Sequence, residues 1–289
     1  MSGDLLSLLV GPFETYGFMR IALVASLALA LANGPIGTLL LMRQESLDGN
    51  VLSHAVMPGA ALGFLYAGYS LAALTLGGLL TGLAVAGLAA LMASTRRQRQ
   101  DAGLIAFYLV SLSFGIMIVA ARGSQADLMH VLFGTVLAVD LKGLVLIACI
   151  SSATMLVLAA LYRPLAVEAF DPAFLRAVGG GGGAFRAIFI TLVVLNLVAS
   201  FQAFGTLLAI GPMLLPAAAA RCWTRKVWPT IALATFIGMA AAVAGLLISY
   251  YAKLPSGPAI VMAAGVMYGL SLPAAGRMWL KPGRLQQPR

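Results

Sequence analysis

The chain has 289 residues, of which 61% are hydrophobic and only 9% are charged. A water-soluble protein of this size cannot cover its surface with so few charges, whereas lipid accepts an apolar surface directly. The formal net charge of +9 could suit nucleic acid, but the placement of the basic residues along the chain argues against that partner. The composition excludes a soluble globular protein and predicts a polytopic membrane protein.

Apolar stretches follow one another along nearly the whole chain, separated by short loops. A helix of about 20 apolar residues crosses a hydrocarbon core of roughly 30 Å. The sequence therefore predicts an all-α transmembrane bundle of eight or nine spans in a single domain, residues 1–289. The second and seventh spans are short, so eight spans with one re-entrant segment is the nearest alternative. The nine predicted spans are Phe18–Met42, Val51–Tyr69, Leu71–Ser94, Ala102–Ala121, Leu141–Tyr162, Arg186–Phe204, Gly205–Ala220, Trp228–Tyr251 and Gly257–Leu280.

Basic residues are distributed unequally between the two sides that these spans define. Fourteen of the 18 Lys and Arg residues fall on the side of the C-terminus, and four fall on the side of the N-terminus: Arg20, Arg122, Lys142 and Lys253. Because Lys and Arg in short loops favour the cytoplasm, the sequence predicts an external N-terminus and a cytoplasmic C-terminus. Residues 162–186 and 221–227 are then cytoplasmic loops, 281–289 a cytoplasmic tail, and 1–17 a segment at the membrane surface.

Glycine and proline mark several positions within and between the spans. Gly59–Gly63 and Gly265–Gly269 have the GxxxG spacing that lets helix backbones approach closely. Gly34-Pro35 and Gly211-Pro212 are predicted to kink or break the first and seventh spans. Broken helices are tolerated in lipid only where protein or water satisfies the freed backbone groups, so both breaks indicate a translocation path. The five glycines Gly179–Gly183 lack the Lys-Ser or Lys-Thr of a phosphate-binding loop and are predicted to form a flexible linker.

His54, at the start of the second span, is the leading candidate for chemistry, because an ionisable residue within hydrocarbon indicates function by default. Asn50 lies one helical turn before it on the same face, and Asp48 precedes both. An imidazole with nearby oxygen donors suits zinc or manganese. From the residues alone, a histidine that hydrogen-bonds across the bundle is the alternative. One chain offers too few donors for a closed site, and a second copy across a two-fold axis would complete four-coordination.

Other residues point to no catalytic chemistry. The chain has no phosphate loop, no paired carboxylates in a span and no acidic chain for proton relay. It is therefore expected to be a transport subunit without enzymatic activity and without a permanently bound cofactor. A primary transporter built on it would need a separate ATPase. His130 is predicted to be an exposed or capping histidine, and Cys149 and Cys222 are not expected to form a disulfide.

Six segments, in order, resemble the permease subunits of ATP-binding-cassette importers for zinc, manganese and iron. The similarity runs from about Pro12 to Leu272. In that family the second-segment pattern is typically Gly-Asp-x-Leu-Ser-His-Ala, and its Asp and His are associated with the metal path. His54 matches this pattern, whereas Asn50 replaces the usual Asp. The segments are PFETYGFMRIAL, LMRQESLDGNVLSHAVMPGAALGF, DAGLIAFYLVSLSFGIMIV, DLMHVLFGTVLAV, GTLLAIGPMLLPAAAAR and GPAIVMAAGVMYGLSL.

The resemblance implies a metal importer in the cytoplasmic membrane of a bacterium. It implies a homodimer that works with cytoplasmic ATPase subunits, an external metal-binding protein and membrane lipid, and without nucleic acid. The metal residues would be His54, Asn50 and Asp48, with zinc the preferred cargo and manganese second. The region that docks on the ATPase would include Pro216, Arg221, Arg225 and Lys226.

Two other classes compete with this interpretation. A secondary transporter would need ionisable residues near the midplane for ion coupling, and the predicted spans have almost none. An intramembrane enzyme would need a partner for His54 in a catalytic constellation, and one histidine with one amide provides none.

Overall fold

A computed structural model describes residues 10–43, 46–67, 70–92, 110, 113–117, 134–171, 174–175, 182–205, 208–224 and 226–279. Within these ranges the protein contains helices and no strand, which confirms the all-α prediction. The helices are α2 (Gly17–Met42), α3 (Ser46–Ala67), α4 (Leu71–Met92), α7 (Leu141–Phe170), α9 (Gly182–Phe204), α10 (Gly211–Arg221), α11 (Val227–Ala252) and α12 (Ser256–Trp279), with a short 3-10 helix, η1 (Val136–Ala138).

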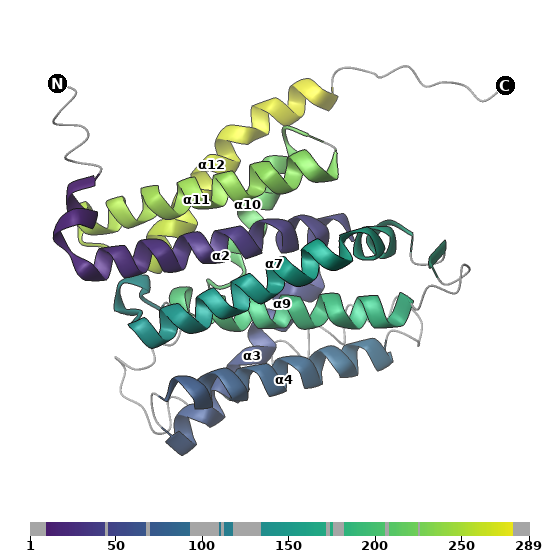
Figure 1. Cartoon of the computed structure of the whole chain (residues 1–289), viewed down its shortest axis with the longest axis horizontal. Helices are drawn as coiled ribbons and strands as arrows, with labels where there is room; N and C mark the ends of the chain where they lie inside the picture. Colours follow the sequence, from purple (N-terminus) through teal and green to yellow (C-terminus); the bar gives the residue numbers. More distant parts are fainter. Residues whose placement is uncertain are drawn as a thin grey trace.

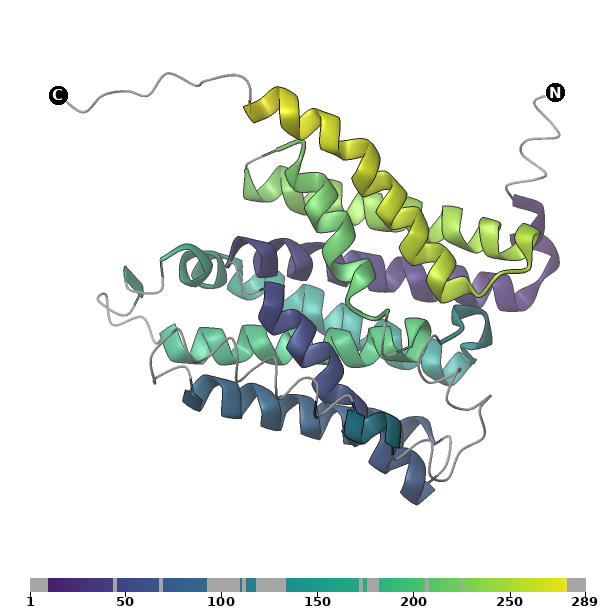
Figure 2. The same cartoon turned by 180° about the vertical axis from the view of Figure 1, so that it is seen from behind.

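The long helices run back and forth along one direction (Figure 1). α2, α4, α7 and α12 run from left to right in that view, whereas α3, α9 and α11 run from right to left (Figures 1 and 2). As a result, α2 begins and α12 ends at opposite ends of the bundle. Five helices, α2, α7, α9, α11 and α12, are long and apolar enough to cross a membrane, and α3 and α4 contribute shorter apolar stretches.

Basic residues gather at the end of the bundle where α2 stops and α11 starts, here called the basic end. Arg43 caps the C-terminus of α2, and Arg186 is the fifth residue of α9. Arg221 is the last residue of α10, and Lys226 caps the N-terminus of α11. The helix termini thus separate the charges as the loop pattern predicts. This separation gives the bundle two chemically distinct ends, as a protein that crosses a membrane needs.

Aromatic side chains mark both ends. Tyr16 contacts Phe18 and Tyr250 at the end opposite to the basic end, with ring centroids 5.4 and 5.8 Å apart. Near the basic end, the Tyr162 and Trp228 rings lie 5.2 Å apart, and Trp228 is 65% exposed. Tyr and Trp are enriched where membrane meets water, so the two groups fit the two interfaces of a bilayer.

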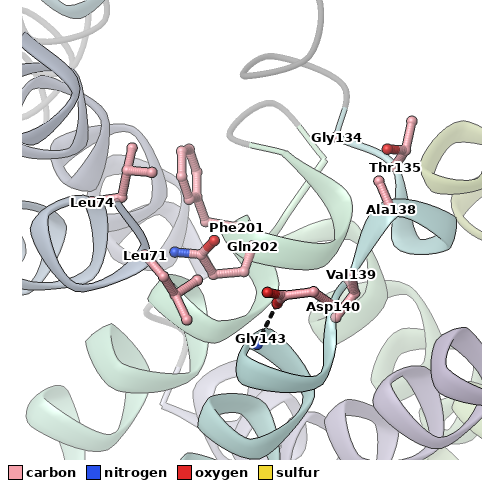
Figure 3. Close-up of a pocket in the computed structure, with 10 residues that line it drawn as sticks. All are labelled: Leu71, Leu74, Gly134, Thr135, Ala138, Val139, Asp140, Gly143, Phe201 and Gln202. Carbon is pink, nitrogen blue, oxygen red and sulfur yellow. Dashed lines mark hydrogen bonds between the residues drawn. The ribbon is translucent and has the colours of Figure 1, made fainter. Parts of the chain in front are cut away.

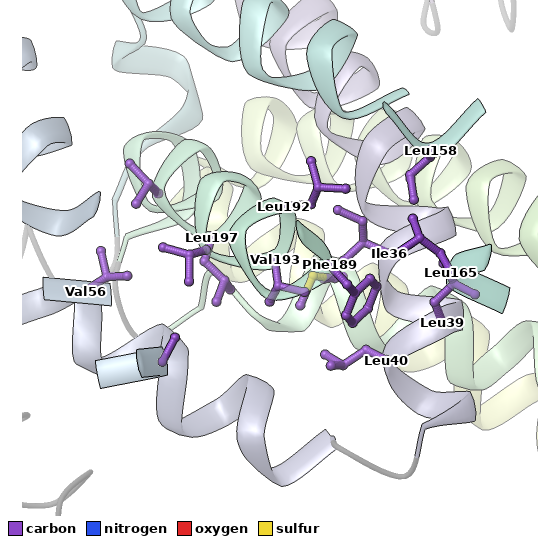
Figure 4. Close-up of a cluster of buried hydrophobic side chains, with 14 residues drawn as sticks. Ile36, Leu39, Leu40, Val56, Leu158, Leu165, Phe189, Leu192, Val193 and Leu197 are labelled. Atoms are coloured by element: carbon purple, nitrogen blue, oxygen red, sulfur yellow. The ribbon is translucent and has the colours of Figure 1, made fainter. Parts of the chain in front are cut away.

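The central hydrophobic cluster joins α2, α7 and α9 (Figure 4). Ile36, Leu39 and Leu40 come from α2 and pack against Leu158 and Leu165 of α7 and a row from α9 that includes Phe189.

The two GxxxG segments differ in what they pack against. A Cβ on Gly59 would overlap the Gly77 carbonyl oxygen, and one on Gly63 would overlap that of Ala73, so the first GxxxG segment packs α3 on α4. Gly265 and Gly269 have nothing within 4 Å of the same position, so the second GxxxG segment packs no helix of the described chain.

The two predicted helix breaks have different outcomes. Of the predicted kink or break in the first span, a break does not occur, because α2 continues through Gly34-Pro35 as one helix. The absence of a side chain at Gly34 and Gly37 allows close helix packing instead, because Gly34 abuts the backbone of Thr235 and Gly37 abuts Met213. The predicted seventh span begins at Gly205, which follows the last residue of α9 and has φ +77°. Pro212 of that span lies in the first turn of α10. Proline is tolerated there because that N–H has no helical partner. The 11 residues of α10 span about 16 Å, so this helix alone does not cross a bilayer.

Other differences concern the fourth span and the longer loops. Most of Ala102–Ala121 lies outside the described residues, but residues 113–117 are helical, and a Cβ on Gly115 would lie 2.9 Å from Cγ of Met57. The cytoplasmic loop expected at 162–186 is instead helical to Phe170. α7 bends at Leu161, just before Pro164, which cannot donate the next helical hydrogen bond. Gly182 and Gly183 begin α9, whereas Gly179–Gly181 lie outside the described residues.

Candidate metal path and partner-docking surface

His54 lies where α3 enters the bundle. Its side chain is 5% exposed, and every residue from His54 to Ala61 is buried. The Gly59–Gly77 contact holds this part of α3 against α4, and Val56 belongs to the central cluster with residues of α9. The predicted ionisable residue is therefore inside the protein and does not face lipid.

Pro58, one turn after His54, affects the backbone at the candidate site. It lies inside α3 and carries no N–H, so it cannot donate the helical hydrogen bond that the carbonyl of residue 54 would normally accept. Pro58 therefore alters the main-chain hydrogen bonding of α3 one turn after His54.

Asp48 and Asn50 lie on α3 as well, although their side chains fall outside the described part of the structure. Asp48 is thus in the first turn of the helix and not in a turn before it. Position 50 is one turn from position 54, whereas positions 48 and 50 are separated by about 200° around the helix axis. On an ideal helix, position 50 therefore falls on the face of position 54, and position 48 falls on another face.

Within the described residues, no group of three or more His, Cys, Asp or Glu side chains could hold a metal ion. Polar residues elsewhere in the helices pair with each other. Asn33 donates to Ser200 Oγ at 3.1 Å, Asn196 to Thr154 Oγ1 at 2.7 Å and Gln202 to Thr75 Oγ1 at 3.3 Å. These hydrogen bonds tie neighbouring helices together, as polar groups in membrane bundles commonly do.

A cavity of about 220 Å³ opens at the end opposite to the basic end (Figure 3). The Asp140 and Gln202 side chains extend into it from the start of α7 and the end of α9, and Leu71, Leu74 and Phe201 form its apolar side. Asp140 also accepts a 2.7 Å hydrogen bond from the Gly143 N–H. This carboxylate therefore caps α7, which gives it a structural role.

The connection between α10 and α11 forms a compact surface at the basic end. Main-chain hydrogen bonds from Cys222, Trp223 and Thr224 to the last turn of α10 close it tightly. Arg221, Trp223 and Lys226 are exposed, whereas Cys222 is buried and burial raises the pKa of its thiol.

The predicted docking residues are not equivalent in the structure. Arg221 and Lys226 flank the connection at its surface, and Arg225 lies outside the described residues. Pro216 is buried within α10, where it faces Gly238 of α11. Pro216 therefore packs α10 against α11.

The sequence interpretation missed a buried ion pair. Arg43 at the end of α2 contacts Glu168 in the last turn of α7, and the two side chains are 4% and 5% exposed. The Arg43 guanidinium carbon lies 3.9 Å above the centre of the Phe189 ring of α9. Leu165 and Glu168 are buried three residues apart.

Together, the apolar helices, the two distinct ends and the buried histidine define a polytopic membrane transport subunit. Residues 15–274 match the ABC 3 transport family, and the chain belongs to that family.

Relatives match over most of their length. The manganese import system permease protein ScaB of Streptococcus parasanguinis is 28% identical over 258 residues, covering 89% of this chain and 91% of ScaB. The manganese transport system membrane protein MntC of Listeria innocua is 30% identical over 254 residues, covering 88% and 89%. Among solved structures, PsaBC from Streptococcus pneumoniae in complex with Fab superposes with a TM-score of 0.85 and 26% identity, covering 97% of this chain and all of the matched chain.

A second solved structure agrees in fold alone. An inward-facing conformation of a putative metal-chelate type ABC transporter gives a TM-score of 0.64 at 12% identity, covering 94% of this chain.

Proposed function

We propose that the chain is the permease subunit of an ATP-binding-cassette importer that moves a divalent transition metal across the cytoplasmic membrane of a bacterium. The observation that carries the proposal is the full-length similarity to permeases named for manganese import, with His54 buried on α3. The proposal includes the expected partners: a second copy of the chain, cytoplasmic ATPase subunits and an external metal-binding protein.

Manganese is the first candidate cargo and zinc the second. The sequence alone favours zinc, because imidazole would supply most of the binding, but the names of the relatives favour manganese. The chemistry of α3 allows this change. Two copies would supply two imidazoles and the two amide oxygens of Asn50, and manganese prefers more oxygen donors than zinc does. Neutral amide oxygens bind weakly, which suits a site from which the ion must leave.

In the proposed membrane orientation, the basic end faces the cytoplasm and Tyr16 lies outside. It is supported by the distribution of Lys and Arg over the helix termini. The α10–α11 connection then faces the cytoplasm, with Arg221 and Lys226 exposed for an ATPase. A secondary transporter is not favoured, because the family is one of ABC transport components.

Metal uptake tests the proposal. Cells that lack their own high-affinity manganese and zinc importers are given this chain with its ATPase and binding protein, and accumulation of each radioactive metal is measured. We expect uptake by the wild type and its loss in His54→Ala, with normal amounts of assembled complex. His130→Ala is the matched control, because it removes the other histidine, and it should transport normally. Normal uptake by His54→Ala would remove His54 from the path.

A further inference from the structure

The Arg43–Glu168 ion pair joins three helices at the basic end. The guanidinium of Arg43 follows the last turn of α2, the carboxylate of Glu168 belongs to the last turn of α7, and the ring under Arg43 is Phe189 of α9. Glu168 is buried at the C-terminus of its helix, where the helix dipole is unfavourable to a negative charge. The positive charge of Arg43 offsets the cost of burying the carboxylate and the unfavourable helix dipole. The ion pair in turn holds the end of α2 in place.

A second contact, from α10, holds the same turn of α2. Nη1 of Arg221 donates a 3.0 Å hydrogen bond to the main-chain carbonyl of Leu41. Arg221 ends α10 and opens the connection proposed to dock on the ATPase. A displacement of that connection therefore acts directly on the end of α2.

The end of α2 leads directly into α3 along the chain. α3 begins at Ser46, three residues after Arg43, and carries Asn50 and His54 in its first turns. Polar contacts thus link the α10–α11 connection to Leu41 and link Arg43 to α7. The main chain leads from Arg43 to the helix of the candidate metal residues.

We infer that the Arg43–Glu168 pair is a positioning device. It holds the end of α2 against α7 and α9, so that movement of the docking connection is transmitted to α3 instead of being absorbed by tilting of α2. This inference rests on the proposed function. Neither residue touches the metal, and both act through α3.

A double substitution separates transmission from simple packing. Breaking one half of a buried ion pair leaves an uncompensated charge, whereas replacing both halves by apolar side chains is often neutral for stability. Arg43→Met with Glu168→Met should therefore assemble with the ATPase. The readout is metal ions transported per ATP hydrolysed in proteoliposomes with radioactive manganese. We expect this ratio to fall about tenfold, within the usual range of coupling free energies, while ATP hydrolysis continues.

The matched control is Asn196→Leu with Thr154→Val, which removes a buried hydrogen bond between α7 and α9 and leaves Arg43 and Glu168 in place. Its ratio should equal that of the wild type. Phe189→Leu, which keeps the ion pair, should lower the ratio in the same direction but less.

Three outcomes would overturn the inference: an unchanged ratio in the Met variant, an equal fall in the control, or loss of assembly in the Met variant with an unchanged ratio in Phe189→Leu. Failure of the wild-type complex to transport manganese or zinc would instead refute the proposed function.

Discussion

Gly59 and Gly77 contact each other so closely that a Cβ on either would overlap the carbonyl oxygen of the other. This reciprocal contact fixes α3 on α4 five residues after His54. No other residue type fits at either position, because the obstructing atoms are backbone and cannot rotate away.

Gly59→Ala should therefore destabilise the bundle. Overpacking of a close contact costs about 1–3 kcal/mol, which exceeds the gain of up to about 1 kcal/mol that alanine usually brings to a helix interior. Gly265→Ala is the matched control, since nothing lies within 4 Å of its Cβ position. Thermal unfolding of both variants in detergent checks the prediction. Equal stability of the two variants would show that α3 and α4 can separate without loss.

Asn50→Asp should shift selectivity towards manganese over zinc. The substitution places a carboxylate one turn before His54, and a hard anionic oxygen strengthens manganese binding more than a neutral amide does. Competitive uptake of the two metals by wild type and variant provides the measurement. Asp48→Asn is the control, because position 48 lies on another face of α3 and its loss should leave selectivity unchanged. A selectivity change in Asp48→Asn alone would contradict the prediction, because it would show that the face of α3 at position 48 governs the choice of metal.

Arg225→Glu with Lys226→Glu should weaken binding of the ATPase without preventing membrane insertion. The reversal puts negative charge at the exposed α10–α11 connection, and charges at the edge of an interface strongly affect association. Co-purification of the ATPase measures the effect, and Lys253→Glu at the opposite end is the control. Unchanged co-purification would move the docking role elsewhere, first to the segment 163–186 that includes the end of α7.

The two termini should be labelled from opposite sides of the membrane. α2 begins and α12 ends at opposite ends of the bundle, and the basic end is expected to face the cytoplasm. A membrane-impermeant maleimide should react from outside with Ser2→Cys and only after lysis with Gln287→Cys, both in a background without Cys149 and Cys222. Labelling of both from one side would contradict an odd number of passes.

The sequence predicted the broad organisation because membrane insertion depends on local properties. Mean apolarity over about 20 residues identifies a spanning segment without knowledge of its neighbours, and seven of the predicted spans correspond to α2, α3, α4, α7, α9, α11 and α12. The sides of the basic residues follow from the same alternation. The prediction that His54 and Asn50 share a helix face also rests on a local property, their spacing within one helix.

Tertiary structure alone decided which of these features have a use. Gly59–Gly63 and Gly265–Gly269 have the same spacing, but only the first meets another helix. Gly34-Pro35 stays within α2, whereas Gly211-Pro212 starts α10. Pro216 is buried, and Glu168 finds Arg43 more than a hundred residues away in the chain. Each of these outcomes depends on contacts between segments distant in sequence, and the free energy of such a contact cannot be obtained from either segment alone.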